Sequence, residues 1–292
     1  MFGFVILNYL NYLDTIELLD SIAAQEWSDS VYIYVVDNGS PNDSVIHLNG
    51  AISKSSLQIK FIESSTNLGF AKGENLGIRY ARADGCEFIA SVNNDVLISN
   101  LQDDFLTIFK KIYAADQSIA VITPTIYDSK GASQNPMALD PPKRFRIFLL
   151  KVFFLLRLNW LYFFFRIHVF FSIISKYVEW RNSRREQSKA SNYKLNSGYI
   201  YAAHGSFQVF TPKYFKYFDG HDEQVFMYCE EYIKAEQLQL KGLKTWYEAN
   251  VVVTHKTSMS VEMMSTSNKE KIKFLLLNMI KSCNVYVKML KF

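Results

Sequence analysis

Apolar stretches with two different periods alternate along the first 128 residues of the chain. Continuous apolar runs rich in β-branched and aromatic residues predict buried strands at 2–8, 31–37, 58–62, 86–92 and 119–123. Apolar residues three and four positions apart predict helices at 13–25, 72–83 and 101–114. Strands that alternate with helices indicate a mostly parallel sheet with helices on both faces, so we expect an α/β fold.

The same two patterns return near the end of the chain. Residues 198–211 and 245–255 have strand character, and 226–241 have the spacing of a helix that ends before Gly242, a typical C-cap residue. The last segment, 266–292, places lysines around apolar positions and predicts an amphipathic helix. We expect this helix either to lie on a membrane surface or to dock on the domain as an ordinary terminal helix.

Residues 145–178 follow neither pattern, because they form an apolar, phenylalanine-rich stretch that lysines and arginines interrupt. Such a stretch is typical of a helix in the membrane interface, with its rings at headgroup depth and its cations on anionic lipid. The alternatives are a helical hairpin in an oligomer interface and a spanning helix whose cations snorkel.

Charge and cysteine content narrow the class of protein further. The net charge is +4, but ten Lys and Arg lie between Lys143 and Arg185, and the rest of the chain is mildly acidic. We therefore expect the basic block to contact an anionic membrane surface, and we expect no nucleic-acid partner. The three cysteines lie far apart, which is typical of reduced thiols in a cytosolic protein. The first residues lack the basic region of a signal peptide, so we expect a protein on the cytoplasmic face of the membrane.

Polar residues follow four of the predicted strands. They are Asn8, Asp37, Asn67 and the run Asn93-Asn94-Asp95. In an open parallel sheet, ligands bind beyond the carboxyl ends of the strands. Each residue alone has a structural explanation, because Asn and Asp also cap helices and make turns. Four such positions together indicate a binding site.

Two segments suggest what this site binds. Asp37 at a strand end can accept hydrogen bonds from a base or a ribose. The glycine-rich segment 67–77 has neither GxGxxG nor a Walker motif, which argues against a dinucleotide fold and a P-loop NTPase. In this segment, Gly69 permits an unusual turn, and Gly73 with Gly77 permits a close helix approach.

Two further groups are candidates for catalysis. Asn93 to Asp95 offer hard oxygen ligands for a divalent cation, Mg²⁺ or Mn²⁺, that bridges a pyrophosphate to the protein. Glu230 and Glu231 follow an apolar segment. Either one of them serves as a general base, or both are solvated residues on the surface of a helix. His255 at a strand end is either a metal or phosphate ligand or a structural histidine.

The order of these motifs resembles the family 2 glycosyltransferases of the GT-A fold, in particular rhamnosyltransferase-like enzymes of bacterial surface polysaccharide assembly. The resemblance is carried by VILNY at 5–9, VVDNGS at 35–40, NLGFAKGENLGI at 67–78, SVNNDV at 91–96, FDGHDEQVFMYCEE at 218–231 and VVVTHKTSMS at 251–260. It does not include the basic aromatic block or the tail.

The resemblance implies roles for particular residues. Asp37 would contact the nucleobase, and the nucleotide cleft would include Asn8, Asn38, Asn67, Gly69, Lys72, Asn75, Asn93 and Asn94. Asn93 and Asp95 would stand at the position of the metal-binding Asp-x-Asp motif, and His255 near the metal or the diphosphate. Glu231, or else Glu230, would be the base; the usual pair is Glu-Asp. Ile233 and Gln237 replace the acid and the arginine usual further along this helix.

The resemblance also implies a domain plan and a reaction. A GT-A domain over 1–265 would have a nucleotide-sugar half at 1–128 and an acceptor and catalytic half at 195–260, interrupted by a membrane-association insert at 141–190. The enzyme would transfer a sugar, with inversion, from a UDP- or dTDP-sugar to a lipid-linked saccharide in O-antigen or capsule assembly. The alternative is a catalytically inactive relative that binds a sugar nucleotide or a partner enzyme at the membrane, and an oligomer is compatible with both functions.

Overall fold

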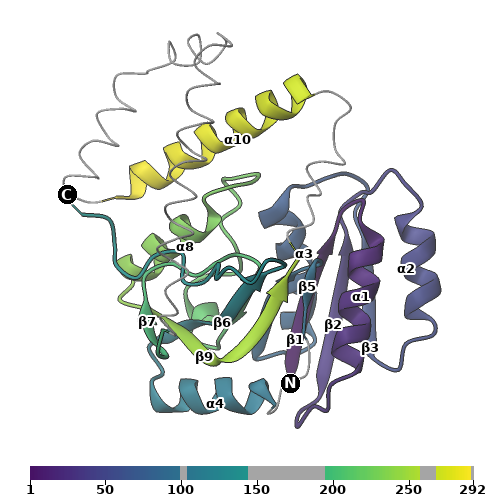
Figure 1. The fold of residues 1–292 in the computed structure, drawn as a ribbon, viewed down its shortest axis with the longest axis horizontal. Coiled ribbons are helices and arrows are strands. Elements are labelled where there is room, and N and C mark those ends of the chain that lie inside the picture. The colour runs from purple at the N-terminus through teal and green to yellow at the C-terminus, as the bar shows by residue number, and fades with distance from the viewer. Residues whose placement is uncertain (99–103, 144–194, 257–267, 291–292) are drawn as a thin grey trace. The chain divides into compact units, whose positions relative to one another are not determined.

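The computed structural model describes residues 1–98, 104–143, 195–256 and 268–290 (Figure 1). The chain divides into one unit of residues 1–140 with 196–289 and a second of 141–195 with 290–292. The described helices and strands belong to the first unit. The predicted membrane-association insert lies almost wholly outside the described residues.

The first half of the sheet is parallel. Its strands and the helices between them are β1 (Phe2–Asn8), α1 (Tyr12–Ala23), β2 (Val31–Asp37), α2 (Ser44–Ile52), β3 (Gln58–Glu63), α3 (Phe70–Ala83) and β4 (Phe88–Asn93). The spatial order is β3-β2-β1-β4, with every neighbouring pair parallel. The carboxyl ends of these strands therefore meet at one edge of the sheet.

The second half makes the sheet mixed. Its elements are β5 (Val96–Leu97), α4 (Phe105–Ala115), β6 (Ile119–Asp128), β7 (Gly198–Ile200), β8 (Phe207–Phe210), the short 3-10 helix η1 (Tyr214–Lys216), α8 (Glu230–Leu240), β9 (Lys244–His255) and α10 (Asn268–Met289). β8 pairs antiparallel with β4 and β6, whereas β6 and β9 are parallel. The expected α/β class is confirmed, with a mixed sheet of nine described strands.

Alternating residues of β1 supply the two cores of the sheet. Phe2, Phe4 and Ile6 pack with residues of α1, α2 and α4 on one face. Val5 packs with residues of α3, η1 and α8 on the other face. This division explains the continuous apolar runs, because strands covered on both faces need apolar residues at every position.

Two glycines let α3 lie directly on β1, as the sequence predicted. A Cβ atom at Gly73 would come within 2.6 Å of Leu7, and one at Gly77 within 2.5 Å of Val5. Real Cβ atoms do not approach other atoms so closely, so larger residues would push the helix away. The close approach fixes α3 relative to the strand ends.

The predicted elements of the second half differ from the structure at two places. The expected strand 198–211 is divided into β7 and β8 by a loop over 201–206. The expected helix 226–241 begins only at Glu230, because Tyr228 and Cys229 have φ of 73° and 62°. A left-handed backbone cannot continue into the right-handed helix, so the apolar residues before Glu230 form a bend.

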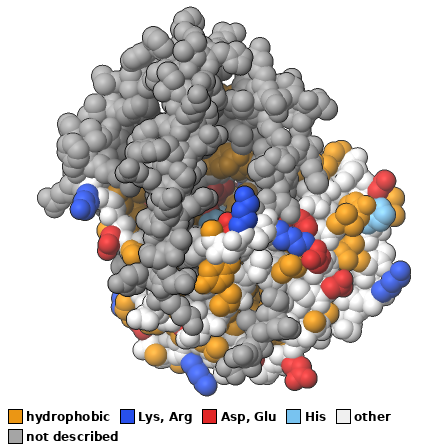
Figure 2. Space-filling view, in the orientation of Figure 1, with side chains coloured by type: hydrophobic (Ala, Val, Ile, Leu, Met, Phe, Trp, Pro, Cys, Tyr) orange, Lys and Arg blue, Asp and Glu red, His pale blue; other side chains and the backbone are white. Residues whose placement is uncertain are grey.

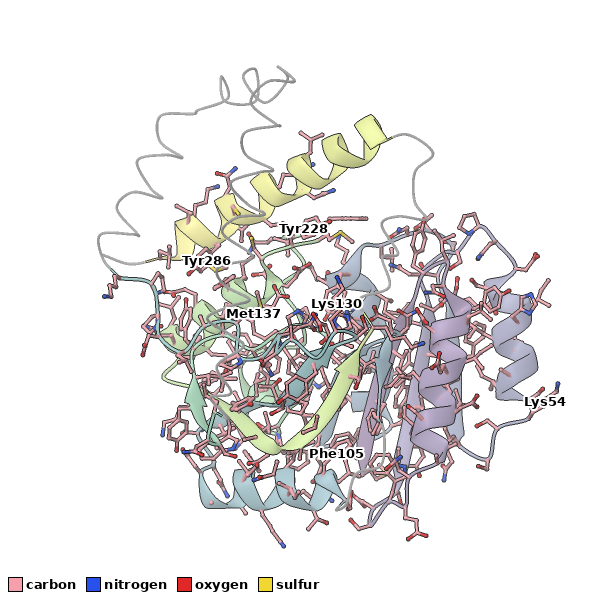
Figure 3. The ribbon with its side chains drawn as sticks, viewed as in Figure 1. Lys54, Phe105, Lys130, Met137, Tyr228 and Tyr286 are labelled. Carbon is pink, nitrogen blue, oxygen red and sulfur yellow. The ribbon has the colours of Figure 1, made fainter. Side chains whose placement is uncertain are left out.

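The helix α10 contacts α8 and the bend that precedes it (Figure 3). Ser282 donates to the carbonyl oxygen of Met227 at 2.7 Å, and the hydroxyls of Tyr201 and Tyr286 are 3.2 Å apart. This part of the predicted C-terminal helix therefore docks on the domain. Among the described residues, no helix is long and apolar enough to cross a membrane.

Candidate active site at the carboxyl ends of the strands

Asn8 and Asp37 end neighbouring parallel strands and bond to each other. They are paired in register, and Asn8 Nδ2 donates to Asp37 Oδ2 at 2.7 Å. The other Asp37 oxygen accepts from the Ser40 amide at 2.9 Å, and the Thr15 hydroxyl donates to Asn8 Oδ1 at 2.8 Å. Asn8 and Asp37 are fully buried. These bonds fix the side chains of Asn8 and Asp37, two residues predicted for nucleotide binding, at the ends of their strands; we call this bonded pair the floor of the site.

A second pair of predicted residues connects the loops after β2 and β3. Asn38 Nδ2 donates to Asn67 Oδ1 at 3.2 Å and to the Gly69 carbonyl at 3.2 Å. The Leu68 amide donates to Asn38 Oδ1 at 3.0 Å. The sequence placed these residues in one cleft, and the structure brings them together.

The predicted residues on α3 have different surroundings. Asn75 donates to the His221 carbonyl at 2.9 Å and accepts from the His221 amide at 2.7 Å. Gly69 lies against the Phe226 carbonyl, which a Cβ atom would approach to 2.7 Å, and the amide of the next residue, Phe70, donates to that carbonyl at 2.9 Å. Both residues therefore anchor the segment that leads to Glu230. Lys72 is exposed, and its part in nucleotide binding stays a prediction.

Asp95 and His255 form the most compact acid–histidine pair of the site. Asp95 Oδ1 lies 3.1 Å from His255 Nε2, and both residues are buried. His255 Nδ1 lies 2.7 Å from Oε1 of Gln134, an acceptor to which a protonated Nδ1 donates. In this tautomer a neutral imidazole would offer the Nε2 lone pair to a cation held between Nε2 and the Asp95 carboxylate.

This pair fits a divalent cation. Two ligands that each lie about 2.1 Å from one Mg²⁺ or similar ion, at right angles, are about 3 Å apart, and Asp95 Oδ1 and His255 Nε2 are 3.1 Å apart. The described residues contain no group of three or more His, Cys, Asp or Glu that could hold a metal. A cation held by two side chains leaves its other positions for phosphate oxygens and water.

The two asparagines before Asp95 face other parts of the site. Asn94 Nδ2 donates to the Asn11 carbonyl at 2.9 Å and to the Thr15 hydroxyl at 3.1 Å, so it ties this turn to the start of α1. The Asn93 amide donates to the Ser206 carbonyl at 2.9 Å. The Asn93 side chain is partly exposed, whereas Asn94 is buried.

Sequence reasoning did not assign a role to His204, which the structure places beside His255. Their ring centroids are 5.4 Å apart. Nδ1 of His204 accepts from the Ser206 amide at 3.2 Å, which places the ring proton on Nε2. Burial, with a smaller contribution from His255, lowers the pKa of His204 to about 4, so the imidazole is neutral at physiological pH. It is therefore an uncharged donor at the edge of the site.

Glu231 lies against the residue that follows His204. A Cβ atom at Gly205 would be 2.8 Å from Glu231 Oε1. Burial raises the pKa of Glu231, and the backbone amides of Glu231 and Gly205 and the Lys234 ammonium oppose that rise. Burial and the charge of Glu231 raise the pKa of Glu230 to about 7. A carboxylate with a pKa raised toward neutral pH is suited to general-base catalysis.

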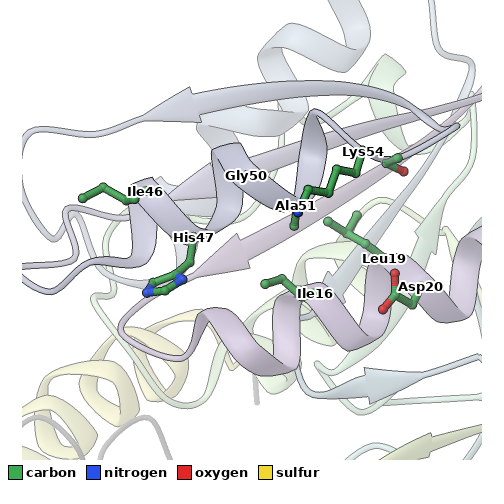
Figure 4. A pocket seen from close by; sticks show the side chains of 9 residues that line it. Ile16, Leu19, Asp20, Ile46, His47, Gly50, Ala51 and Lys54 are labelled. Atoms are coloured by element: carbon green, nitrogen blue, oxygen red, sulfur yellow. The ribbon is translucent and has the colours of Figure 1, made fainter.

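The described surface also has an open hollow of about 450 Å³ between α1 and α2 (Figure 4). Its lining includes Ile16, Leu19, Ile46 and His47. Hydrophobic side chains gather beside a histidine on this side of the molecule (Figure 2). None of the residues that line the hollow belongs to the clusters around Asp37, Asp95 or Glu231, so we assign it no part in the site.

Comparison with solved structures identifies the fold. Residues 1–349 of S. aureus TarS in complex with UDP match with a TM-score of 0.54 at 14% identity, over 88% of this chain and 60% of that chain. GalNAc-T7 with UDP, GalNAc and Mn²⁺ matches with a TM-score of 0.59 at 11% identity, over 89% and 44%. The mannosyltransferase PcManGT from Pyrobaculum calidifontis in complex with GDP-Man and Mn²⁺ matches with a TM-score of 0.53 at 14% identity, over 98% and 69%. All three support a GT-A-like fold.

Sequence comparison identifies the family. An N-acetylglucosaminyltransferase of Bradyrhizobium diazoefficiens is 31% identical over 83 residues, which are 28% of this chain and 16% of that protein. The sequence model described as Glycosyl transferase family 2 matches residues 4–180, more than half of the 292 residues. The chain therefore belongs to glycosyl transferase family 2.

Proposed function

We propose that the protein transfers a sugar, with inversion, from a nucleoside-diphosphate sugar to a hydroxyl group of a saccharide acceptor. One observation carries the proposal. The consecutive residues His204 and Gly205 contact His255 of the acid–histidine pair and Glu231, respectively. The cation site and the base of this proposal would therefore both lie next to these two consecutive residues.

Asp95 and His255 are the residues that would hold the cation. Bound there, Mg²⁺ or Mn²⁺ supplies positive charge that stabilises the nucleoside diphosphate as it leaves. The protein's own contribution is the fixed orientation of the two ligands. Gln134 sets the His255 tautomer, and the Lys256 amide donates to the Asp95 carbonyl at 2.9 Å, which fixes the end of β9.

Glu231 is the residue that we assign as the general base. It accepts the proton of the acceptor hydroxyl, while its contact with Gly205 sets the direction of the carboxylate. The pKa of Glu230 is raised to about 7, partly by the charge of Glu231, so the two carboxyl groups do not both ionise freely. Glu230 is the alternative base.

The floor formed by Asn8 and Asp37, with the loop of Asn38 and Asn67, is the site that we assign to the nucleotide. A UDP- or dTDP-sugar is the donor that we propose; solved relatives contain UDP or GDP-Man. Asp37 already bonds through both oxygens, so a nucleobase would use its remaining lone pairs.

For the acceptor, the proposal is a lipid-linked saccharide in surface polysaccharide assembly, with rhamnose or another hexose as the transferred sugar. Ten Lys and Arg between Lys143 and Arg185 support a protein that rests on the cytoplasmic face of an anionic membrane. An acceptor anchored in the same membrane would present its glycan to the enzyme.

Release of nucleoside diphosphate from a panel of sugar nucleotides tests the proposed function. The detergent-solubilised protein would be assayed with Mn²⁺ or Mg²⁺, a polyprenyl-linked acceptor extract, and a chelator control. We expect release from one donor, and loss of release with chelator and in D95A and E231Q. D43A and E87Q are matched controls, because Asp43 and Glu87 are exposed and belong to none of the clusters around Asp37, Asp95 or Glu231. Near-wild-type turnover of E231Q would exclude Glu231 as the base.

A second candidate function is a catalytically inactive relative that binds a sugar nucleotide. The Glu-Glu pair and the single carboxylate among Asn93, Asn94 and Asp95 favour it. Calorimetric titration with the same nucleotides separates the two. Tight donor binding without turnover, in the presence of every acceptor fraction, would support the inactive relative; turnover of any donor would exclude it.

A further inference from the structure

A buried lysine lies one turn after Glu231 on α8. Lys234 is 6% exposed, and its ammonium donates to Oε1 of Gln208. The same nitrogen lies 4.4 Å from the centroid of the Phe210 ring. Lysine is rarely buried, because the ammonium loses its hydration, so Lys234 needs compensating charge from its neighbours.

Gln208 connects Lys234 to the loop that contacts both halves of the site. Its Nε2 atom donates to the carbonyl oxygens of Ala203 at 3.2 Å and His204 at 3.1 Å. The next residue, Gly205, is the one against which Glu231 lies. α8 and this loop are therefore joined twice, once through Lys234 and Gln208 and once through Glu231 and Gly205.

Four titratable groups face Lys234. Glu231 and Glu230 come from its own helix, Glu74 comes from α3, and His221 comes from the segment after η1. Burial lowers the pKa of His221 well below its usual value, so this imidazole is neutral. The balancing negative charge must come from the three carboxyl groups.

Glu74 is the least suited of these carboxyl groups to be ionised. It is fully buried, and neither of its oxygens makes a hydrogen bond of normal geometry with the described residues. Burial raises the pKa of Glu74 to about 8, against smaller opposing effects of Ser91 and Lys234. Glu74 is therefore mostly protonated at neutral pH, and the carboxylates at the start of α8 remain as partners for the ammonium.

Lys234 and Glu231 affect each other reciprocally. Burial lowers the pKa of Lys234 to about 7, and the charge of Glu231 is the largest influence that opposes this. The ammonium in turn lowers the pKa of Glu231, which burial raises. Each group thus favours the charged form of the other.

We propose that Lys234 is a positioning residue that holds Glu231 in its ionised form and fixes α8 against the 203–206 loop. The inference rests on the proposed function, in which ionised Glu231 takes the proton of the acceptor hydroxyl. Lys234 itself acts through Glu231 and Gln208, and it touches neither donor nor acceptor.

K234M removes the charge and keeps an unbranched apolar side chain beside Phe210. Loss of a nearby cation raises the pKa of a carboxylate, typically by about one unit or more. We therefore expect the acid limb of the plot of kcat/KM against pH to move to higher pH. At pH values below the pKa of Glu231, kcat/KM should be about tenfold lower in K234M than in the wild-type enzyme, and the two should become equal at high pH. K241M is the matched control, because Lys241 is exposed at the end of the same helix.

An infrared titration of carboxyl groups gives a second measurement that does not require turnover. Subtracting the spectrum of E231Q from that of the wild-type protein isolates the signal of the Glu231 carboxyl group. Subtracting the spectrum of K234M/E231Q from that of K234M isolates the same signal in the absence of the lysine. We expect Glu231 to titrate at higher pH in K234M. Unchanged titration, or a K234M enzyme with lower kcat and an unmoved acid limb, would overturn the proposal. If the wild-type protein turns over no donor, the proposed function fails, while the infrared result still decides the role of Lys234.

Discussion

Gly205 lies so close to Glu231 that a Cβ atom in its place would be 2.8 Å from Oε1 of the carboxylate. Gly205 does not have the positive φ that demands glycine, so alanine is tolerated by the backbone. Glycine is needed at this position instead because the Glu231 carboxylate occupies the space that a side chain at residue 205 would take. G205A is therefore expected to displace Glu231 while the fold is kept. Misplacement of a catalytic group by about 1 Å can cost about a hundredfold in rate, so we expect a fall in kcat of about ten- to a hundredfold.

Steady-state kinetics with G198A as the matched control tests this expectation. Gly198 also lacks a positive φ, and a Cβ atom there would meet nothing within 4 Å. The donor KM should change little in G205A, because the proposed nucleotide site around Asp37 is built from other loops. Equal kcat values for G205A and G198A would show that the contact with Gly205 does not orient Glu231.

Much of the arrangement around the proposed nucleotide site could be predicted from the sequence. Parallel strands place their carboxyl ends together, so Asn8 and Asp37 had to meet once β1 and β2 were recognised as neighbours. The close approach of α3 to a neighbour could also be predicted, because the four-residue spacing of Gly73 and Gly77 puts both on one face of the helix. In these cases local sequence pattern and sheet geometry suffice.

The arrangement around the proposed cation site and base could not be derived in this way. Gln134, His204 and His255 meet through loops and strand pairings that have no local periodicity. The bend at Tyr228 and Cys229 was missed because nothing in an apolar sequence marks a left-handed backbone at residues other than glycine or asparagine. Asn75 was assigned to the nucleotide by motif alone, whereas its bonds with His221 anchor the chain before Glu230.

Gln134 is expected to tune metal affinity without touching the metal. Its Oε1 atom lies 2.7 Å from His255 Nδ1 and orients the ring so that Nε2 faces Asp95. Removal of such a partner typically weakens metal binding by about ten- to a hundredfold. We expect Q134L to raise the Mn²⁺ concentration for half-maximal activity by about tenfold or more, with little change in kcat at saturating metal. Q117L is the control, because Gln117 is exposed; the same metal requirement in both variants would contradict this role.

Glu230 is expected to make the protein less stable as the pH rises toward and through neutrality. Burial and the charge of Glu231 raise its pKa to about 7 from the ordinary value of 4.5. Between these values the folded state holds a proton that the unfolded state has lost, so the free energy of unfolding falls as pH rises through this window. E230Q removes this dependence. We expect E230Q to raise Tm relative to wild type at pH 8 and to have a much smaller effect at pH 4. An equal change in Tm at both pH values would mean that Glu230 titrates normally.

Cys229 and Cys283 are expected to form a disulfide when the protein is treated with hydrogen peroxide. Their sulfur atoms are 3.3 Å apart, and a hydrogen bond from Cys229 lowers the pKa of Cys283 to about 7, so a reactive thiolate is present at neutral pH. The two thiols would lose two protons and two electrons, a bond would form between the sulfurs, and peroxide would be reduced to water. The bridge would tie the residue before Glu230 to α10 and restrict the start of α8, which carries the proposed base. We expect a loss of turnover that dithiothreitol reverses and that C283S does not show. Mass spectrometry of the oxidised protein would identify the linked peptides; loss of turnover in C283S to the same extent would assign the effect to another oxidised residue.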